Sequence, residues 1–192
     1  MQAHPPDEPL PERTWLIGTL VFYALLAAGA IAWIALQHGV DAVQARILGT
    51  APVHDVLLGA LVGGLVVAAT RLGHRLVPGV DGMARALGRA IGPMSLLGCC
   101  ILALLSGFTE EVIFRATLQP AIGPIWATLA FALVHAPFER DLWAWPLFAL
   151  AVGTLFALLF ASTGAALAPM VAHMVINAFN LRWIAVHWGA QR

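Results

Sequence analysis

The chain has 192 residues, of which 60% are hydrophobic and only 10% are charged. An ordinary soluble domain carries about 25% charged residues, so this composition excludes a soluble domain and predicts an integral membrane protein built as one bundle. The formal net charge is zero, which argues against a nucleic-acid partner because such proteins carry a basic surface.

The first thirteen residues are polar and rich in proline. We expect residues 1–13 to form a disordered tail and residues 14–192 to form a single transmembrane helical domain. The apolar run that begins at residue 14 is longer than the core of a signal peptide and is followed by no convincing cleavage site. It is therefore predicted to remain in the protein as a spanning helix.

The distribution of apolar residues predicts an all-α fold, a polytopic membrane bundle of about six transmembrane helices. Each spanning helix needs about 20 mainly apolar residues. The expected ranges are 15–36, 53–70, a segment from 91 or 93 to 118, 121–137, 144–162 and 165–184.

The segment 71–89, between the second and third predicted spans, has a different character. It holds four of the arginines, with apolar residues between them. This pattern predicts a loop followed by a short amphipathic helix on the membrane surface, with a plain basic loop as the alternative. Positive charge favours the cytoplasmic side, so an even number of spans places both termini in the cytoplasm. The ten basic residues are all arginine, which favours a bacterial chain and hence the inner membrane.

Polar residues interrupt three of the predicted spans in the second half of the chain. A charged residue at the centre of a spanning helix costs about 2.5–3.5 kcal/mol, so such residues indicate a functional site by default. With a rise of about 1.5 Å per residue, the carboxylate, imidazole and amide groups on these helices fall in one band near the midplane. The three groups are Glu110, Glu111 and Arg115; Phe131 and His135; and His173 and Asn177.

The spacing within these groups suggests distinct roles. Glu111 and Arg115 are four residues apart, in the favourable order for a helical ion pair. Glu110 points about 100° away from Glu111 and suits a general base, with His135 sharing its water. His173 and Asn177 share a helix face, and two N–H groups aimed at one point would form an oxyanion hole. The alternative is structural: ion pairs and hydrogen bonds that join helices.

A metal site is a second chemical alternative. Glu110, His135 and His173 would supply one carboxylate and two imidazoles, a set typical of zinc with an open position for water. No local motif such as H-E-x-x-H supports it. The pattern therefore leaves open whether the water is bound by a divalent metal or is activated by glutamate and histidine alone.

Together the three motifs resemble a known family. E-E-V-I-F-R at 110–115 fits E-E-x-x-x-R, F-A-L-V-H at 131–135 fits F-x-x-x-H, and H-M-V-I-N at 173–177 fits H-x-x-x-N. In this order they are similar to the motifs of the CAAX protease and bacteriocin-processing family, also called the CPBP or Abi family. Its eukaryotic branch contains the Ras-converting CAAX endopeptidase. The resemblance covers residues 92–181.

This resemblance implies an intramembrane endopeptidase. Glu110 with His135 would activate the hydrolytic water, and His173 with Asn177 would stabilise the oxyanion. Glu111, Arg115 and Phe131 would support the site. The family is described both as metalloproteases and as glutamate-type enzymes. Expected substrates are membrane-associated peptides: precursors, bacteriocin leaders or C-terminal anchors, held among membrane lipid.

Two other classes of protein fit the same residues. A non-catalytic immunity or scaffold protein would use the polar cluster for packing. A small proton-coupled transporter would use intramembrane glutamate and histidine as a proton path, although the chain shows no inverted repeat of the kind typical of transporters.

Overall fold

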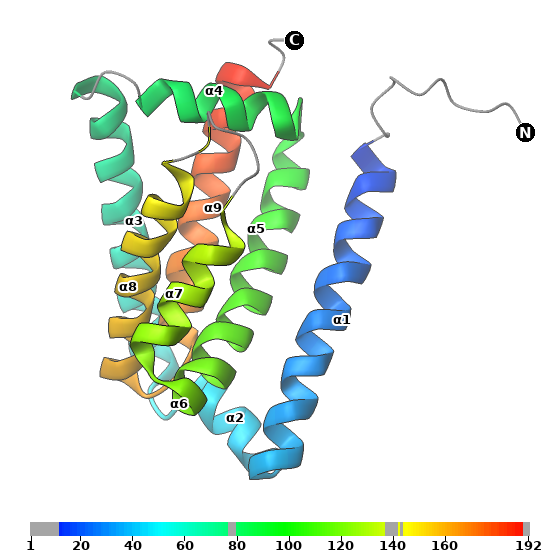
Figure 1. Ribbon diagram of the computed structural model, residues 1–192, viewed down its shortest axis with the longest axis vertical. Coiled ribbons are helices and arrows are strands. Elements are labelled where there is room, and N and C mark those ends of the chain that lie inside the picture. The colour runs from blue at the N-terminus through cyan, green and yellow to red at the C-terminus, as the bar shows by residue number, and fades with distance from the viewer. Residues whose placement is uncertain (1–11, 77–79, 137–141, 143, 190–192) are drawn as a thin grey trace, which may run out of the picture.

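The computed structural model describes residues 12–76, 80–136, 142 and 144–189. These ranges are almost entirely helical and contain no strand, so the predicted all-α membrane bundle is confirmed (Figure 1). The helices are α1 Glu12–His38, α2 Val40–Leu48, α3 Pro52–Leu76, α4 Val80–Ile91, α5 Leu96–Glu111, α6 Gln119–Ile122, α7 Pro124–Val134, α8 Trp145–Thr163 and α9 Leu167–Trp188, and a π-helical segment, η1 Val112–Leu118, joins α5 to α6.

Four of the predicted spans are long and apolar enough to cross a membrane within the described ranges. They are α1, α3, the continuous helix Leu96–Ile122 and α8. The predicted span at 121–137 is shorter than expected, because Gly123 has a φ of 85° and the helix restarts at Pro124 and ends at Val134. The segment predicted to span at 165–184 forms the helix α9, which is not among these four; it carries polar residues and packs against α3, α4, α5 and α8.

The amino-terminal prediction needs one adjustment. α1 begins at Glu12, so the last two residues of the predicted tail are helical. Residues 1–11 lie outside the described residues, as do residues 77–79 of the basic segment and Arg140, which the predicted topology places in a cytoplasmic loop.

The predicted amphipathic helix is present as α4, so the alternative of a plain basic loop is wrong for residues 80–91. Figure 1 shows α4 crossing one end of the bundle, the end at which α1 begins and α9 finishes. At this end the guanidinium of Arg85 lies 5.2 Å from the centre of a Trp188 ring on α9. The short helix α2, at the opposite end of α1, has no counterpart among the predicted elements.

Close packing places α9 in the centre of the bundle. A Cβ atom on Gly59 or Gly63 of α3 would collide with the backbone oxygens of Ala168 and Ala172 on α9. This G-x-x-x-G spacing puts both glycines on one helix face and allows the two backbones to approach closely, a common device in membrane bundles. The polar residues of α9 are thereby held inside the protein.

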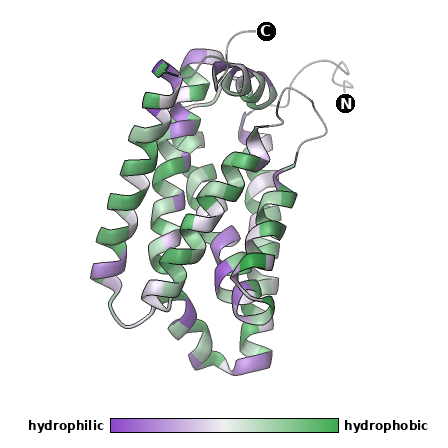
Figure 2. Cartoon of the chain, turned by 60° about the vertical axis from the view of Figure 1, so that its left-hand side comes forward, coloured by the Kyte–Doolittle hydropathy of each residue, from purple (hydrophilic) through white to green (hydrophobic). Residues whose placement is uncertain are grey.

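The outer surface is apolar. In the most apolar window of α1 and of α3, only 11% of residues are buried, against 44% in the helix Leu96–Ile122. Figure 2 shows hydrophobic residues along the lengths of the helices, with hydrophilic residues at both ends of the bundle and within it. Exposed leucine and valine side chains over the length of a span suit contact with lipid.

Candidate active site

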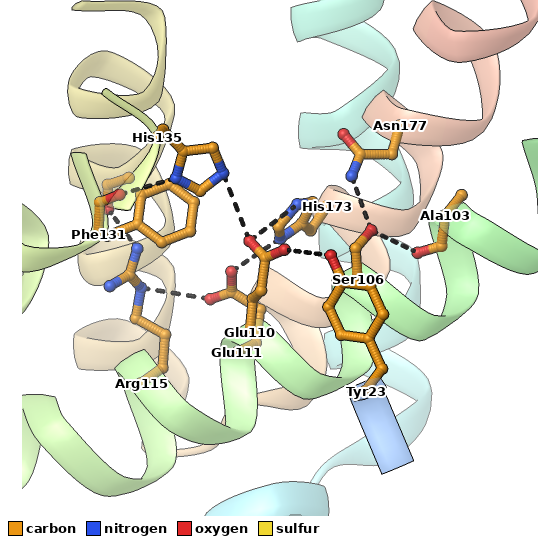
Figure 3. Close-up of polar contacts among 11 residues, drawn as sticks. Tyr23, Ala103, Ser106, Glu110, Glu111, Arg115, Phe131, His135, His173 and Asn177 are labelled. Atoms are coloured by element: carbon orange, nitrogen blue, oxygen red, sulfur yellow. Dashed lines mark hydrogen bonds and ion pairs between the residues drawn. The ribbon is translucent and has the colours of Figure 1, made fainter. Parts of the chain in front are cut away.

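The predicted site residues come together in the bundle. Glu110, Phe131, His135, His173 and Asn177 line one cavity of about 330 Å³. Glu111 and Arg115 lie directly behind this cavity and are fully buried. Figure 3 shows their side chains converging from α5, η1, α7 and α9.

Glu110 lies at the centre of the cluster. Its Oε2 atom is 3.6 Å from Nε2 of His135 and 3.9 Å from Nε2 of His173. Its Oε1 atom accepts a hydrogen bond of 3.1 Å from the hydroxyl of Tyr23 on α1. Oε2 is buried and makes no hydrogen bond to the described residues. The two distances are too long for direct hydrogen bonds and suit contact through a small bridging group.

His135 is held in one orientation. It follows the last residue of α7, and its Nδ1 lies 2.7 Å from the carbonyl oxygen of Phe131. A carbonyl only accepts hydrogen bonds, so Nδ1 carries the proton, and in the neutral ring Nε2 presents a lone pair toward Glu110. Phe131 also supplies an aromatic face, with the guanidinium of Arg115 5.0 Å from the ring centre.

The predicted ion pair between Glu111 and Arg115 is present, with Nε 3.2 Å from Oε2. Arg115 also donates from Nη2 to the carbonyl oxygen of Gly153 on α8 at 3.1 Å. The other Glu111 oxygen lies 2.9 Å from Nδ1 of His173. One buried carboxylate therefore joins a guanidinium to an imidazole and fixes the ring of His173 with Nε2 toward Glu110.

Asn177 lines the cavity one helical turn beyond His173. Its amide donates a hydrogen bond of 2.9 Å to Oγ of Ser106 on α5. The amide group carries two N–H donors, of which this contact uses one. His173 and Asn177 thus share a face of α9, as the spacing predicts, and both are tied to α5.

Sequence reasoning did not single out two residues of the cluster, Tyr23 and Ser106. Ser106 lies four residues before Glu110, so helical periodicity alone places it on the same face. Tyr23 is the only tyrosine in the chain. A lone phenol group within the 27-residue helix α1 was a usable signal, but no motif connects it to a partner 87 positions away.

The three predicted metal ligands are residue types that bind zinc, but their ligand atoms lie further apart than on one tetrahedral ion. Phe131 and Glu111 orient the two imidazoles as outer-shell partners of a metal would. Ligand atoms on one tetrahedral zinc ion, at bond lengths of about 2.0–2.1 Å, lie about 3.3 Å apart, closer than the 3.6 Å and 3.9 Å seen here. Within the described ranges, no group of three or more His, Cys, Asp or Glu side chains is placed to hold a metal ion.

The fold and this cluster define a helical membrane protein with a buried carboxylate–imidazole site. Residues 92–179 match the family of type II CAAX prenyl endopeptidase Rce1-like proteins. The match covers slightly less than half of the chain, and it confirms the resemblance predicted from the three motifs.

A curated relative matches part of the chain. The uncharacterized protein YpbD of Bacillus subtilis (strain 168) is 42% identical over 79 residues, which make up 40% of this chain and 40% of the relative. The match thus spans less than half the length of either protein. No solved structure gives a significant match to the chain.

Proposed function

We propose that the chain is an intramembrane endopeptidase of the CAAX type, in which Glu110 and His135 activate the hydrolytic water. The observation that carries the proposal is the 3.6 Å separation of Glu110 Oε2 and His135 Nε2 in a cavity inside an apolar bundle. The match to a family named for CAAX prenyl endopeptidases suggests the same class of reaction.

The reaction begins with a water molecule between the Glu110 carboxylate and Nε2 of His135. One of these groups accepts a proton as the water oxygen attacks the carbonyl carbon of the peptide bond, which forms a tetrahedral intermediate. The C–N bond then breaks, and the same proton passes to the leaving amine. One water is consumed, and the products are a carboxylic acid and an amine.

His173 and Asn177 are placed to stabilise the oxyanion of that intermediate. Asn177 contributes an amide N–H from the cavity wall. His173 gives Nδ1 to Glu111, so it donates into the cavity from Nε2 in its doubly protonated form. The Glu111 carboxylate supports that positive charge, and Arg115 completes the buried charge network. Preorganised donors of this kind are worth about 10²–10³ in kcat each.

The unsatisfied oxygen of Glu110 favours an enzyme over an immunity or scaffold protein. Buried polar atoms with a purely structural role are nearly always hydrogen-bonded. Glu110 Oε2 is buried without such a bond among the described residues and points at two imidazoles. A group held ready for a reacting molecule has this arrangement.

The membrane proposed for the protein is the bacterial inner membrane, with both termini in the cytoplasm. Arg71, Arg75, Arg85 and Arg89 all belong to α3 and α4, at the end of the bundle where α1 begins and α9 ends. An excess of arginine at one end favours the cytoplasmic side. The proposed substrates are membrane-associated peptides or C-terminal anchors.

Cleavage of a library of membrane-anchored and C-terminal peptides by detergent-purified protein tests this function. Glu110→Gln and His135→Ala are each expected to lower the rate by about 10²–10⁴, the contribution of a general acid–base group. Asp41→Asn is the matched control, because it removes an exposed carboxylate on α2. Full activity in folded Glu110→Gln protein would overturn the proposal.

The same assay with an added metal chelator decides whether the reaction needs a metal ion. Activity that persists after chelation supports water activated by glutamate and histidine. Activity that disappears, and returns with added zinc, would instead assign the three-residue ligand set Glu110, His135 and His173 to a divalent ion.

A further inference from the structure

Ser106 and Asn177 form a polar contact between α5 and α9 in the wall of the candidate active site (Figure 3). The side-chain amide of Asn177 donates a hydrogen bond to Oγ of Ser106 at 2.9 Å. The serine is only 4% exposed. Both residues line the cavity that contains Glu110, so the contact belongs to the same cavity as the proposed general base.

The two helices approach each other closely at this point. A Cβ atom on Gly107, the residue after Ser106, would lie 2.7 Å from Cγ of Met174 and 3.0 Å from its backbone nitrogen. A side chain at position 107 would therefore push α5 and α9 apart. At the observed separation, the short side chains of Ser106 and Asn177 meet directly.

The hydroxyl of Ser106 acts as the acceptor in this contact. Its Oγ atom lies 3.5 Å from the carbonyl oxygen of Ala103, one turn earlier on α5, and a carbonyl only accepts hydrogen bonds. Serine hydroxyls within helices commonly give their proton to such a carbonyl. Ser106 therefore accepts an N–H from Asn177, and this bond turns the nitrogen end of the amide toward α5.

This orientation decides which end of the Asn177 amide faces a reacting peptide. Glu110 follows Ser106 by four residues, so the two side chains share a face of α5 and lie about 6 Å apart along the helix axis. The amide nitrogen lies against that face and has a second N–H, which Ser106 does not use. An amide turned the other way would place its carbonyl oxygen there, and that oxygen would repel an oxyanion.

We propose that Ser106 is a positioning residue of the oxyanion hole, which fixes the side-chain amide of Asn177 with its second N–H toward the tetrahedral intermediate. This inference rests on the proposed endopeptidase function. Ser106 acts through Asn177 and forms no bond to the substrate. It favours the transition state over the bound substrate, because negative charge on the carbonyl oxygen develops only as the water attacks.

Steady-state cleavage of one peptide by Ser106→Ala protein tests this role. The variant is expected to lower kcat about tenfold to a hundredfold and to leave KM unchanged, because displacement of a catalytic group by about 1 Å costs up to about 10²-fold. A peptide phosphinate has a tetrahedral anionic centre that resembles the intermediate. It is expected to inhibit the variant more weakly than wild type by the same factor.

Two further variants sharpen the test. Ser106→Cys keeps a weak acceptor in a side chain of similar shape, so it is expected to lose less kcat than Ser106→Ala. Ser162→Ala is the matched control, because it removes a hydroxyl that bonds to a carbonyl of its own helix, α8. It is expected to change neither kcat nor the inhibition by the phosphinate.

A double-mutant cycle with Asn177→Ala separates a positioning role from an independent one. In the Asn177→Ala protein, the added change Ser106→Ala is expected to have no further effect on kcat, because the serine acts only through the amide. Losses of kcat that multiply would overturn the proposal. So would a loss beyond about 10³-fold in Ser106→Ala alone, since that exceeds the contribution of a whole oxyanion-hole donor and would make the serine a reacting group.

The unfolding free energies of the same four proteins in detergent give a measurement that does not need catalysis. Coupling between Ser106 and Asn177 in unfolding free energy, without coupling in kcat, would assign the hydrogen bond to helix packing alone and overturn the positioning role. Equal kcat values for Ser106→Ala and wild type would overturn it and leave the endopeptidase function intact. A folded wild-type protein that neither cleaves peptides nor binds the phosphinate would instead overturn the endopeptidase function itself.

Discussion

The amino-terminal helices α1 and α3 differ from the carboxyl-terminal segment 92–179 in burial and in the side chains they carry. The first two bury only 11% of the residues in their most apolar window, whereas the helix Leu96–Ile122 buries 44% of its own. The carboxyl-terminal segment carries the charge network and matches the Rce1-like family. α1 contributes Tyr23 to the lining of the candidate active-site cavity, and α3 contributes Thr70, Arg71 and His74 to the lining of a second cavity, among α3, α4, α8 and α9. The buried segment therefore positions the chemistry, and the outer helices add contacts to it from the membrane side.

The largest effect on stability is expected where the buried segment holds charge. Glu111→Ala leaves Arg115 buried without its carboxylate and removes the partner of His173. Loss of one member of a buried ion pair costs about 3–5 kcal/mol. The free energy of unfolding in detergent, followed by denaturant titration, measures this loss.

A matched control is Glu111→Ala combined with Arg115→Met, which removes both buried charges. The double variant is expected to recover part of the lost stability, because no unpaired charge remains. If Glu111→Ala were as stable as wild type, the buried charge network would make no measurable contribution to stability, and the proposed contrast in stability between the two regions would be wrong.

A smaller effect is expected where the outer region contacts the site. Tyr23→Phe removes the hydroxyl that donates to Glu110 Oε1 and frees the carboxylate to rotate away from the imidazoles. A hydrogen bond to a charged group contributes about 1.5–3 kcal/mol, so kcat/KM is expected to fall about tenfold or more. Steady-state cleavage of one peptide by wild type and variant checks this.

Val21→Ala, at an exposed neighbouring position of α1, controls for general disturbance of the helix. Equal rates for Tyr23→Phe and wild type would show that α1 has no part in positioning Glu110.

The smallest effect is expected on the outer face of α1. Leu25 is 70% exposed, so Leu25→Ala should change the unfolding free energy in detergent by less than about 0.5 kcal/mol. Thermal unfolding of the two proteins side by side measures it. A large loss of unfolding free energy would mean that this face of α1 packs against protein. The contrast between exposed outer helices and buried inner helices would then be wrong for α1.

The helices and the side-chain pairs within one helix could be predicted from the sequence, because both depend on local spacing. The length of apolar runs predicted the long spans, and the four-residue interval predicted the ion pair of Glu111 and Arg115. Sequence reasoning missed α2, since nine residues of mixed polarity resemble a loop. It overestimated the fourth span, because the break at Gly123 depends on a backbone angle.

Contacts between helices were beyond the reach of spacing. The hydrogen bond between Glu111 and His173 joins residues 62 positions apart, and it depends on how closely α9 is held against its neighbours. Arg71 entered the sequence argument only as a charge that indicates topology. Its place in a cavity follows from Asn180 and Trp183, which sit on another helix.

The π-helical segment η1 changes the direction in which side chains face along the helix that contains it. Glu111, just before η1, reaches α9, whereas Arg115 within it and Gln119 beyond it bond to the α8 carbonyls of Gly153 and Ala157. The wide turn, in which the backbone N–H of Gln119 donates to the Phe114 carbonyl five residues back, acts like an inserted residue in a continuous helix. Deleting one residue from η1 would restore an ordinary helix in which the groups before and after the turn no longer face their two partners together.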